Sequence, residues 1–208
     1  MAKELTNEEK SVFLDKIYGA VVEGLPYVDK PINELVAEYK NKYTDTEKAI
    51  KVFVRNQKLK CSTTGFVTGL GGLLTLPVTI PADLASSLYI ELRMIAAIAA
   101  MRGYNVQDDA VKTLVYICIV GNAAGDVLKQ TGIKFANQYA AKSLLPKLTR
   151  EIIVKINKAV GFRLITKGGT KGLINVGRAI PVLGGIVGGT YNYVEVAVFA
   201  KKAKKFFD

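Results

Sequence analysis

The chain has 208 residues, of which half are hydrophobic and 23% are charged, and its formal net charge is +11. This length and composition argue against disorder and predict one well-packed domain. The chain has no histidine, which excludes Ser-His-Asp and Cys-His catalysis and any His-ligated zinc site. The two cysteines, Cys61 and Cys118, lack CxxC spacing, and we interpret them as reduced thiols. We therefore assign no catalytic residue, metal or cofactor.

The positive charge is concentrated in the last third of the chain. Residues 1–60 carry 11 basic and 10 acidic side chains, residues 61–130 carry 4 and 5, and residues 131–208 carry 14 and 3. Such asymmetry indicates that the last third faces an anionic partner such as phospholipid or nucleic acid. A solubilising face without a partner is the alternative.

Residues 1–60 are expected to form helical hairpins of mixed charge, with helices over 5–24 and 32–42 and a third helix that begins near Thr44 or Asp45. The N-terminal segment has no basic region followed by an apolar one, so we expect a cytoplasmic protein. Residues 61–208 are expected to form a glycine-rich helical core with a basic C-terminal third. We expect the two parts to be one folding unit.

Residues 61–82 carry no charge and are long enough to span a bilayer. Their glycines and prolines disfavour a continuous helix, so we prefer a packed glycine-rich helix and turn. A re-entrant segment and an ordinary membrane span remain alternatives. The residues assigned to helix packing or a pocket are Gly69, Gly72, Pro77 and Pro81.

Residues 82–102 predict a helix that is apolar on most sides. At about 100° per residue, Asp83, Glu91 and Arg93 fall in one polar arc. Such an arc can mark a functional pocket, and it also fits a buried salt bridge or a solvent-facing side. We expect this helix to pack against a helix within residues 180–200, with Asp83 capping or pairing at the junction.

Two basic segments are candidates for anion or membrane binding. In residues 147–164, apolar positions share one helical face and Lys147, Arg150, Lys155 and Lys158 share the other. This pattern fits a membrane-surface helix and equally an ordinary packed helix with a solvated face. The chain then ends with Lys201, Lys202, Lys204, Lys205, Phe206 and Phe207. Lysines beside aromatic rings suit a phospholipid interface, and a solvated helix end is the alternative.

A second glycine-rich segment precedes the basic end of the chain. Its glycines form two rows at i and i+4, which permits helix contact at very short distance in membranes or in water. The residues assigned to this packing or to a pocket are Gly184, Gly185, Gly188, Gly189 and Asn192.

Three blocks, "TGLGGLLTLPVTIPADL", "RMIAAIAAMRGYNV" and "AIPVLGGIVGGTYN", occur in this order between residues 68 and 192. Together they resemble the EcsC protein family of bacteria, and the resemblance covers roughly residues 45–205. It implies a helical protein and supplies no agreed catalytic residues. The positions that match are Gly69, Gly71, Gly72, Pro77, Pro81, Asp83, Gly103, Tyr104, Pro181, Gly184, Gly185, Gly188 and Asn192.

These observations predict an all-α single domain of about eight helices with glycine-rich, close-packed helix hairpins. We expect a non-enzymatic protein that associates peripherally with an anionic membrane, at the inner face of the cell membrane, or that binds a lipid or apolar ligand. One alternative is a soluble homo-oligomeric interaction module or an accessory of a membrane transporter. Another is an enzyme that uses the Asp83, Glu91 and Arg93 arc. Nucleic acid ranks below lipid because no recognition motif is present.

Overall fold

The computed structural model describes residues 5–26, 29–61, 82–133, 140–168 and 189–208. Within these residues it contains nine α-helices, two short 3-10 helices and no strand, which confirms the predicted all-α single domain. The helices are α1 (Asn7–Glu23), α2 (Ile32–Lys42), α3 (Thr46–Cys61), α5 (Ala82–Met101), α6 (Asp109–Val120), α7 (Ala124–Gln130), α8 (Ala141–Leu144), α9 (Arg150–Gly168) and α11 (Gly189–Phe206), with 3-10 helices η1 (Gly121–Ala123) and η2 (Leu145–Lys147). Buried apolar side chains from these elements form one contiguous core.

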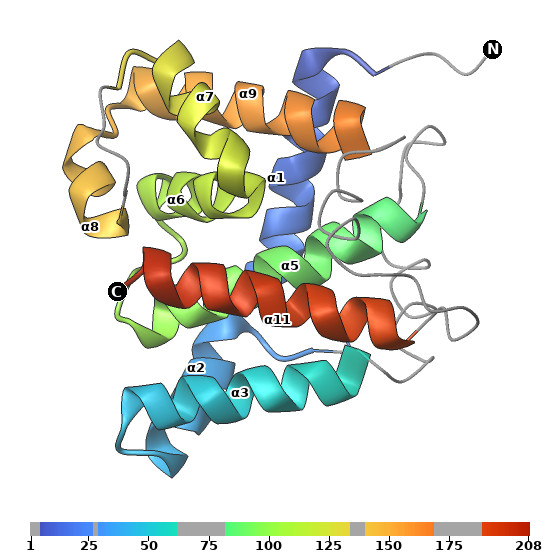
Figure 1. The fold of residues 1–208 in the computed structure, drawn as a ribbon, viewed down its shortest axis with the longest axis vertical. Helices are drawn as coiled ribbons and strands as arrows, with labels where there is room; N and C mark the ends of the chain where they lie inside the picture. The colour runs from blue at the N-terminus through green and yellow to red at the C-terminus, as the bar shows by residue number, and fades with distance from the viewer. Residues whose placement is uncertain (1–4, 27–28, 62–81, 134–139, 169–188) are drawn as a thin grey trace.

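The helix α5 lies at the centre of this core. It packs against α1, α2, α3, α6 and α11, so it is covered on most of its sides (Figure 1). Its contact with α11 confirms the predicted pairing of these two segments. The window Leu84–Met101 is long and apolar enough to cross a membrane, but 83% of it is buried inside the protein. A core helix passes the same test, so this window does not place the chain in a membrane.

The helix α9 uses its apolar face for the core. Ile156, Val160 and Leu164 are buried against the neighbouring helices, which are chiefly α1 and α6. At Gly161 the helix α9 lies against α1, since a Cβ at this position would be 3.4 Å from the Ser11 Cα atom, within van der Waals contact. The amphipathic pattern of this segment is therefore that of a packed helix whose basic side faces outward.

Several predicted packing residues lie outside the described residues. They are Gly69, Gly72, Pro77, Pro81, Gly184, Gly185 and Gly188. The glycine-rich hairpins therefore stay a prediction. Gly189 is the first residue of α11, and the side chains of Asp83 and Asn192 are outside the description.

Local sequence signals define the two ends of α1. At its start the Thr6 side chain accepts a hydrogen bond from the Glu9 backbone, and the Glu9 carboxylate accepts one from the Thr6 backbone. At its end Gly24 adopts a φ of 78°, which is the left-handed region where glycine is favoured. A Cβ on Gly24 would lie 2.5 Å from the Asp29 carbonyl oxygen. The turn after α1 therefore requires glycine.

We predict opposite effects for two alanine substitutions in this region. Gly24→Ala should lower the free energy of unfolding by more than about 1 kcal/mol, because the new Cβ meets backbone atoms and φ is positive. Gly19→Ala is the matched control, since no atom lies within 4 Å of its new Cβ. It should raise stability by about 0.5–1 kcal/mol through helix propensity. Urea unfolding followed by circular dichroism measures both, and equal effects of the two substitutions would contradict the turn geometry.

Candidate functional site

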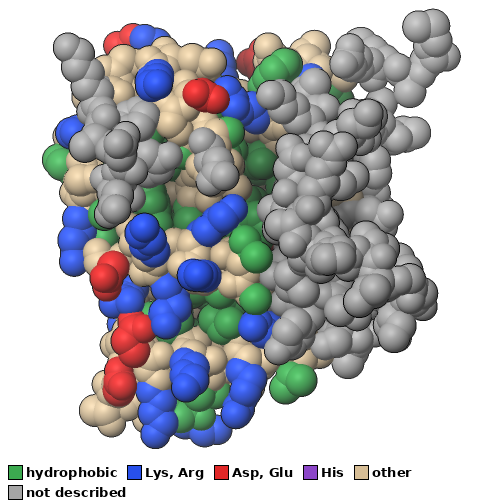
Figure 2. Space-filling view, in the orientation of Figure 1, with side chains coloured by type: hydrophobic (Ala, Val, Ile, Leu, Met, Phe, Trp, Pro, Cys, Tyr) green, Lys and Arg blue, Asp and Glu red, His purple; other side chains and the backbone are tan. Residues whose placement is uncertain are grey.

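A groove of about 1080 Å³ lies between α3 and α11. The two helices run antiparallel, so the C-terminal end of α11 lies beside the start of α3 (Figure 1). Eight of the fourteen lining residues are Lys or Arg, and two are Asp or Glu. Figure 2 shows these basic side chains gathered over the two helices with hydrophobic side chains among them. The groove is therefore a concave surface with a strong excess of positive charge.

The helix α3 supplies half of these cations, Lys48, Lys51, Arg55 and Lys58. Successive members are three or four residues apart, so they share one face of the helix. The opposite face buries Ile50 and Phe53 in the core and thereby fixes the direction of the basic face. The sequence analysis missed this set because residues 1–60 are nearly neutral in sum. The spacing of the four cations is the signal that would have found it.

The other basic lining residues are Arg102, directly after α5, and Lys201, Lys204 and Lys205 of α11. At the end of the groove where α3 begins, two carboxylates form ion pairs with these basic residues. Glu47 of α3 pairs with Arg102 and lies 3.0 Å from the Lys204 Nζ atom. Asp208 lies 3.1 Å from the Arg102 guanidinium. These ion pairs connect the start of α3, the end of α5 and the C-terminal residues.

Five groove cations have no ion-pair partner among the described residues. They are Lys48, Lys51, Arg55, Lys201 and Lys205. Apolar side chains, including Val52 and Ala200, line the groove with them. The lining therefore combines positive charge with apolar area, which is the chemistry that complements an anionic ligand with an apolar part.

The structure separates the predicted tail residues into two groups. Lys201, Lys204 and Lys205 line the groove, whereas the Lys202 Nζ atom lies 5.0 Å from the centre of the Phe199 ring, close to Gly121. Lys202 is not a groove residue.

We expected the Phe206 and Phe207 side chains to contact lipid, and their burial corrects this expectation. Phe206 is 7% exposed and Phe207 is 1% exposed. The Phe207 ring packs edge-on against Tyr104, with 5.1 Å between ring centres. The reason is that α11 continues to Phe206 as a core helix, so its last apolar side chains complete the core.

The basic residues of the second predicted segment form a different surface. Lys147, Arg150, Lys155 and Lys158 are exposed on η2 and α9. Lys155 pairs with Glu151 at 2.6 Å, and with Lys158 it lines a separate groove of about 510 Å³. In Figure 1 the helix α9 lies at the opposite end of the molecule from α3. The two predicted basic segments therefore do not make one site.

Two members of the polar arc of α5, Glu91 and Arg93, are buried. Arg93 is 3% exposed and its Nε atom lies 3.4 Å from the Asp29 carboxylate, which is 1% exposed. Arg93 also donates hydrogen bonds to the carbonyl oxygens of Val21 and Lys30. These contacts fasten the end of α1 and the connection to α2 onto α5. Arg93 thus forms the buried salt bridge that the sequence left open. Glu91 is also buried, and neither residue lines the α3–α11 groove.

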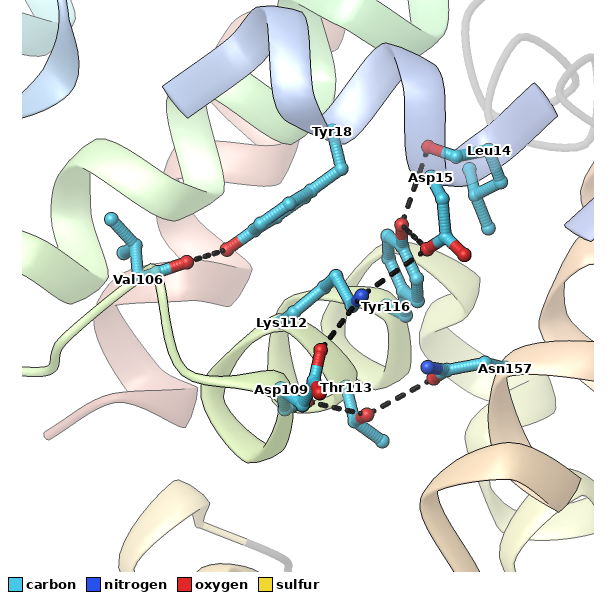
Figure 3. Close-up of polar contacts among 9 residues, drawn as sticks. All are labelled: Leu14, Asp15, Tyr18, Val106, Asp109, Lys112, Thr113, Tyr116 and Asn157. Carbon is cyan, nitrogen blue, oxygen red and sulfur yellow. Dashed lines mark hydrogen bonds and ion pairs between the residues drawn. The ribbon is translucent and has the colours of Figure 1, made fainter. Parts of the chain in front are cut away.

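A second polar cluster joins α1, α6 and α9 (Figure 3). The Tyr116 hydroxyl lies 3.2 Å from the Leu14 carbonyl oxygen and 3.1 Å from the Asp15 carboxylate. Lys112 pairs with Asp15 and with Asp109 at 3.4 and 2.9 Å. Burial lowers the pKa of Lys112, but these two carboxylates outweigh burial and the net change is upward. The cluster acts as a cross-link between helices.

Thr113 extends this cluster to α9. Its hydroxyl lies 3.0 Å from the Asn157 side-chain oxygen and 2.8 Å from the Asp109 carbonyl oxygen. The Tyr18 hydroxyl donates to the Val106 carbonyl at 2.9 Å on the other side of α1. These contacts give the Thr113 and Tyr18 hydroxyl groups hydrogen-bond partners. A buried polar group without a partner would lower the stability of the fold.

Burial also keeps Cys118 from acting as a thiolate. It raises the pKa of this thiol to about 12, although the nearby Lys202 charge opposes the shift. A protonated thiol is a poor nucleophile and a poor metal ligand. Among the described residues, no group of three or more Asp, Glu or Cys side chains is placed to hold a metal ion.

The fold and the groove define an all-α protein with a positively charged two-helix surface. Residues 14–208 match the model of the EcsC protein family, and the chain belongs to that family. The match extends the resemblance seen in the motifs to α2 and most of α1. No curated protein and no solved structure matches the chain.

We predict that the buried ion pair of Arg93 is essential for stability. Arg93→Met should lower the free energy of unfolding by about 3–5 kcal/mol, because it removes two backbone hydrogen bonds and a buried cation that pairs with the Asp29 carboxylate. Adding Asp29→Asn should recover part of this loss. Arg55→Met is the control because Arg55 is exposed, and it should change the free energy of unfolding by no more than about 0.5 kcal/mol. Urea unfolding measures all three, and wild-type stability of Arg93→Met would contradict the assignment.

We also predict a loss of stability at alkaline pH. Burial raises the pKa of Tyr116, Tyr18 and Tyr89 above the ordinary value. Tyrosine in an unfolded chain ionises near pH 10, whereas these three stay protonated in the fold. Above about pH 10 each should therefore lower the free energy of unfolding by about 1.4 kcal/mol per pH unit.

The test is urea unfolding at several pH values above and below 10. Tyr116→Phe should make the alkaline slope shallower by one tyrosine's share, about 1.4 kcal/mol per pH unit. Tyr43→Phe is the control, because Tyr43 is outside the three buried sites. An unchanged slope in Tyr116→Phe would contradict the prediction.

Proposed function

We propose that this protein is a non-enzymatic peripheral membrane protein that binds anionic phospholipid through the α3–α11 groove. The observation that carries the proposal is the set of five groove cations without an ion-pair partner among the described residues. Each Lys or Arg near an anionic surface contributes about 1 kcal/mol, so these five contribute about 5 kcal/mol. That magnitude suits reversible association. The proposed location is the cytoplasmic face of the membrane, where anionic lipids are found.

The proposal rests on charge at the surface rather than on insertion of a described helix. The apolar faces of α5 and α9 are packed in the core, and so are the rings of Phe206 and Phe207. These groups offer nothing to the lipid interior while the fold is intact. Binding through exposed lysines and arginines is screened by salt. A steep dependence on ionic strength is therefore the expected signature.

Sedimentation with liposomes tests this function. The purified protein should bind vesicles that contain phosphatidylserine and not neutral vesicles, and about 0.5 M NaCl should release it. Changing Lys51, Arg55, Lys201 and Lys205 together to Gln should weaken binding at least about tenfold. The matched control changes Lys147, Arg150, Lys155 and Lys158 to Gln, which removes the same charge from η2 and α9. It should change binding by less than about threefold.

Three results would overturn the proposal. No binding to any vesicle would exclude membrane association. Binding that persists in high salt would exclude an electrostatic mode and indicate insertion. Equal losses in both quadruple variants would show that net charge matters and that the groove does not.

A further inference from the structure

We infer that the α3–α11 groove is a headgroup site for a phospholipid that carries several phosphate groups, rather than a surface for diffuse membrane charge. The inference rests on the proposed function and names the ligand class of the same site. It depends on three features of the groove: its length, the fixed positions of its cations, and the nature of its other lining residues.

The cations extend farther than one phosphate reaches. On α3 the cations without an ion-pair partner among the described residues run from Lys48 to Arg55, which is about 10 Å at 1.5 Å per residue. On α11 they run from Lys201 to Lys205, which is about 6 Å. A phosphodiester headgroup with a single charge can contact only a small part of this array. Neutralising the array requires several anionic groups spaced along one ligand, and phosphate monoesters supply more charge and more acceptor oxygens than diesters.

The backbone positions of the cations are fixed, because they lie on two packed helices that line the groove from either side. Lys204 pairs with Glu47 across the groove at 3.0 Å. One turn farther from this pair, Lys51 of α3 and Lys201 of α11 both line the groove, one on each of the two antiparallel helices. Arg55 follows on α3, and its planar guanidinium can bind phosphate oxygens in a bidentate manner. Because the core fixes both helices, a multivalent ligand would find its cations already arranged.

The two carboxylates give the groove a direction. Glu47 and Asp208 lie at the end where α3 begins, and they pair with Arg102 and Lys204 there. The two carboxylates neutralise Arg102 and Lys204 at this end, so phosphates are attracted more strongly toward Lys51, Arg55 and Lys201. We therefore place the phosphate groups beside these three residues.

The remaining lining residues favour a lipid headgroup over nucleic acid. The apolar part of the lining consists of Val52, Val54, Ala197 and Ala200. These side chains suit the carbon face of a polyol ring or a glycerol unit. No aromatic side chain is among the described lining residues, whereas single-stranded nucleic acid is commonly bound by stacking its bases on aromatic rings.

The experiment compares vesicles of equal surface charge. One set contains phosphatidylserine, and the other contains a phosphatidylinositol bisphosphate at the lower fraction that gives the same charge. The wild-type protein should bind the bisphosphate vesicles at least about tenfold more tightly. The triple variant Lys51→Gln, Arg55→Gln, Lys201→Gln should lose this preference. The control variant Lys147→Gln, Arg150→Gln, Lys158→Gln should keep it, and circular dichroism with thermal unfolding checks that both variants fold.

Further arms separate this inference from the proposed function. Equal binding to the two vesicle types would overturn the inference and leave the peripheral membrane function standing. Calorimetry with soluble inositol trisphosphate tests the headgroup without a membrane. Groove-dependent binding of this probe without vesicle binding would support the ligand class and overturn the membrane function. Tighter binding of a single-stranded oligonucleotide than of the bisphosphate vesicles would overturn the inference in favour of nucleic acid.

Discussion

The need to cover α5 on nearly every side is the constraint on which the rest of the structure depends. This helix is apolar on most of its sides, and exposing these sides to water would cost more free energy than any surface contact could return. Helices from distant parts of the chain therefore pack around it, with α1, α2 and α6 on some sides and α11 and α3 on others. Arg93 is compatible with this burial because Asp29 balances its charge and two backbone carbonyls accept hydrogen bonds from its guanidinium.

The basic groove is a consequence of that packing. Once the apolar face of α11 is packed against α5, three of its lysines, Lys201, Lys204 and Lys205, are left on the side that faces α3. The same holds for α3, whose buried residues direct four of its five cations toward the groove. Two basic helix faces then lie side by side, which is electrostatically costly without a partner. Glu47 and Asp208 relieve part of this repulsion, and an anionic ligand would relieve the rest.

Much of the fold follows from local patterns. The helices expected over residues 5–24, 32–42 and 82–102 agree closely with α1, α2 and α5, because caps, glycines and apolar periodicity are local signals. The motifs also identified the EcsC family correctly. The structure corrects the role expected for the two phenylalanines of the tail, and the role of the tail lysines stays a prediction. Phe206 and Phe207 beside lysines look the same in the sequence whether the helix end is solvated or buried, and tertiary packing makes that choice.

The sequence by itself determined the helical class, the positions of the principal helices, the family and the excess of positive charge. Only the tertiary structure decided which cations share a surface. A charge balance over residues 1–60 conceals the basic face of α3, since the acidic residues that cancel it largely lie on other helices and other faces. The physical reason is that helix periodicity specifies which side chains share a face, whereas burial of apolar area specifies which faces meet.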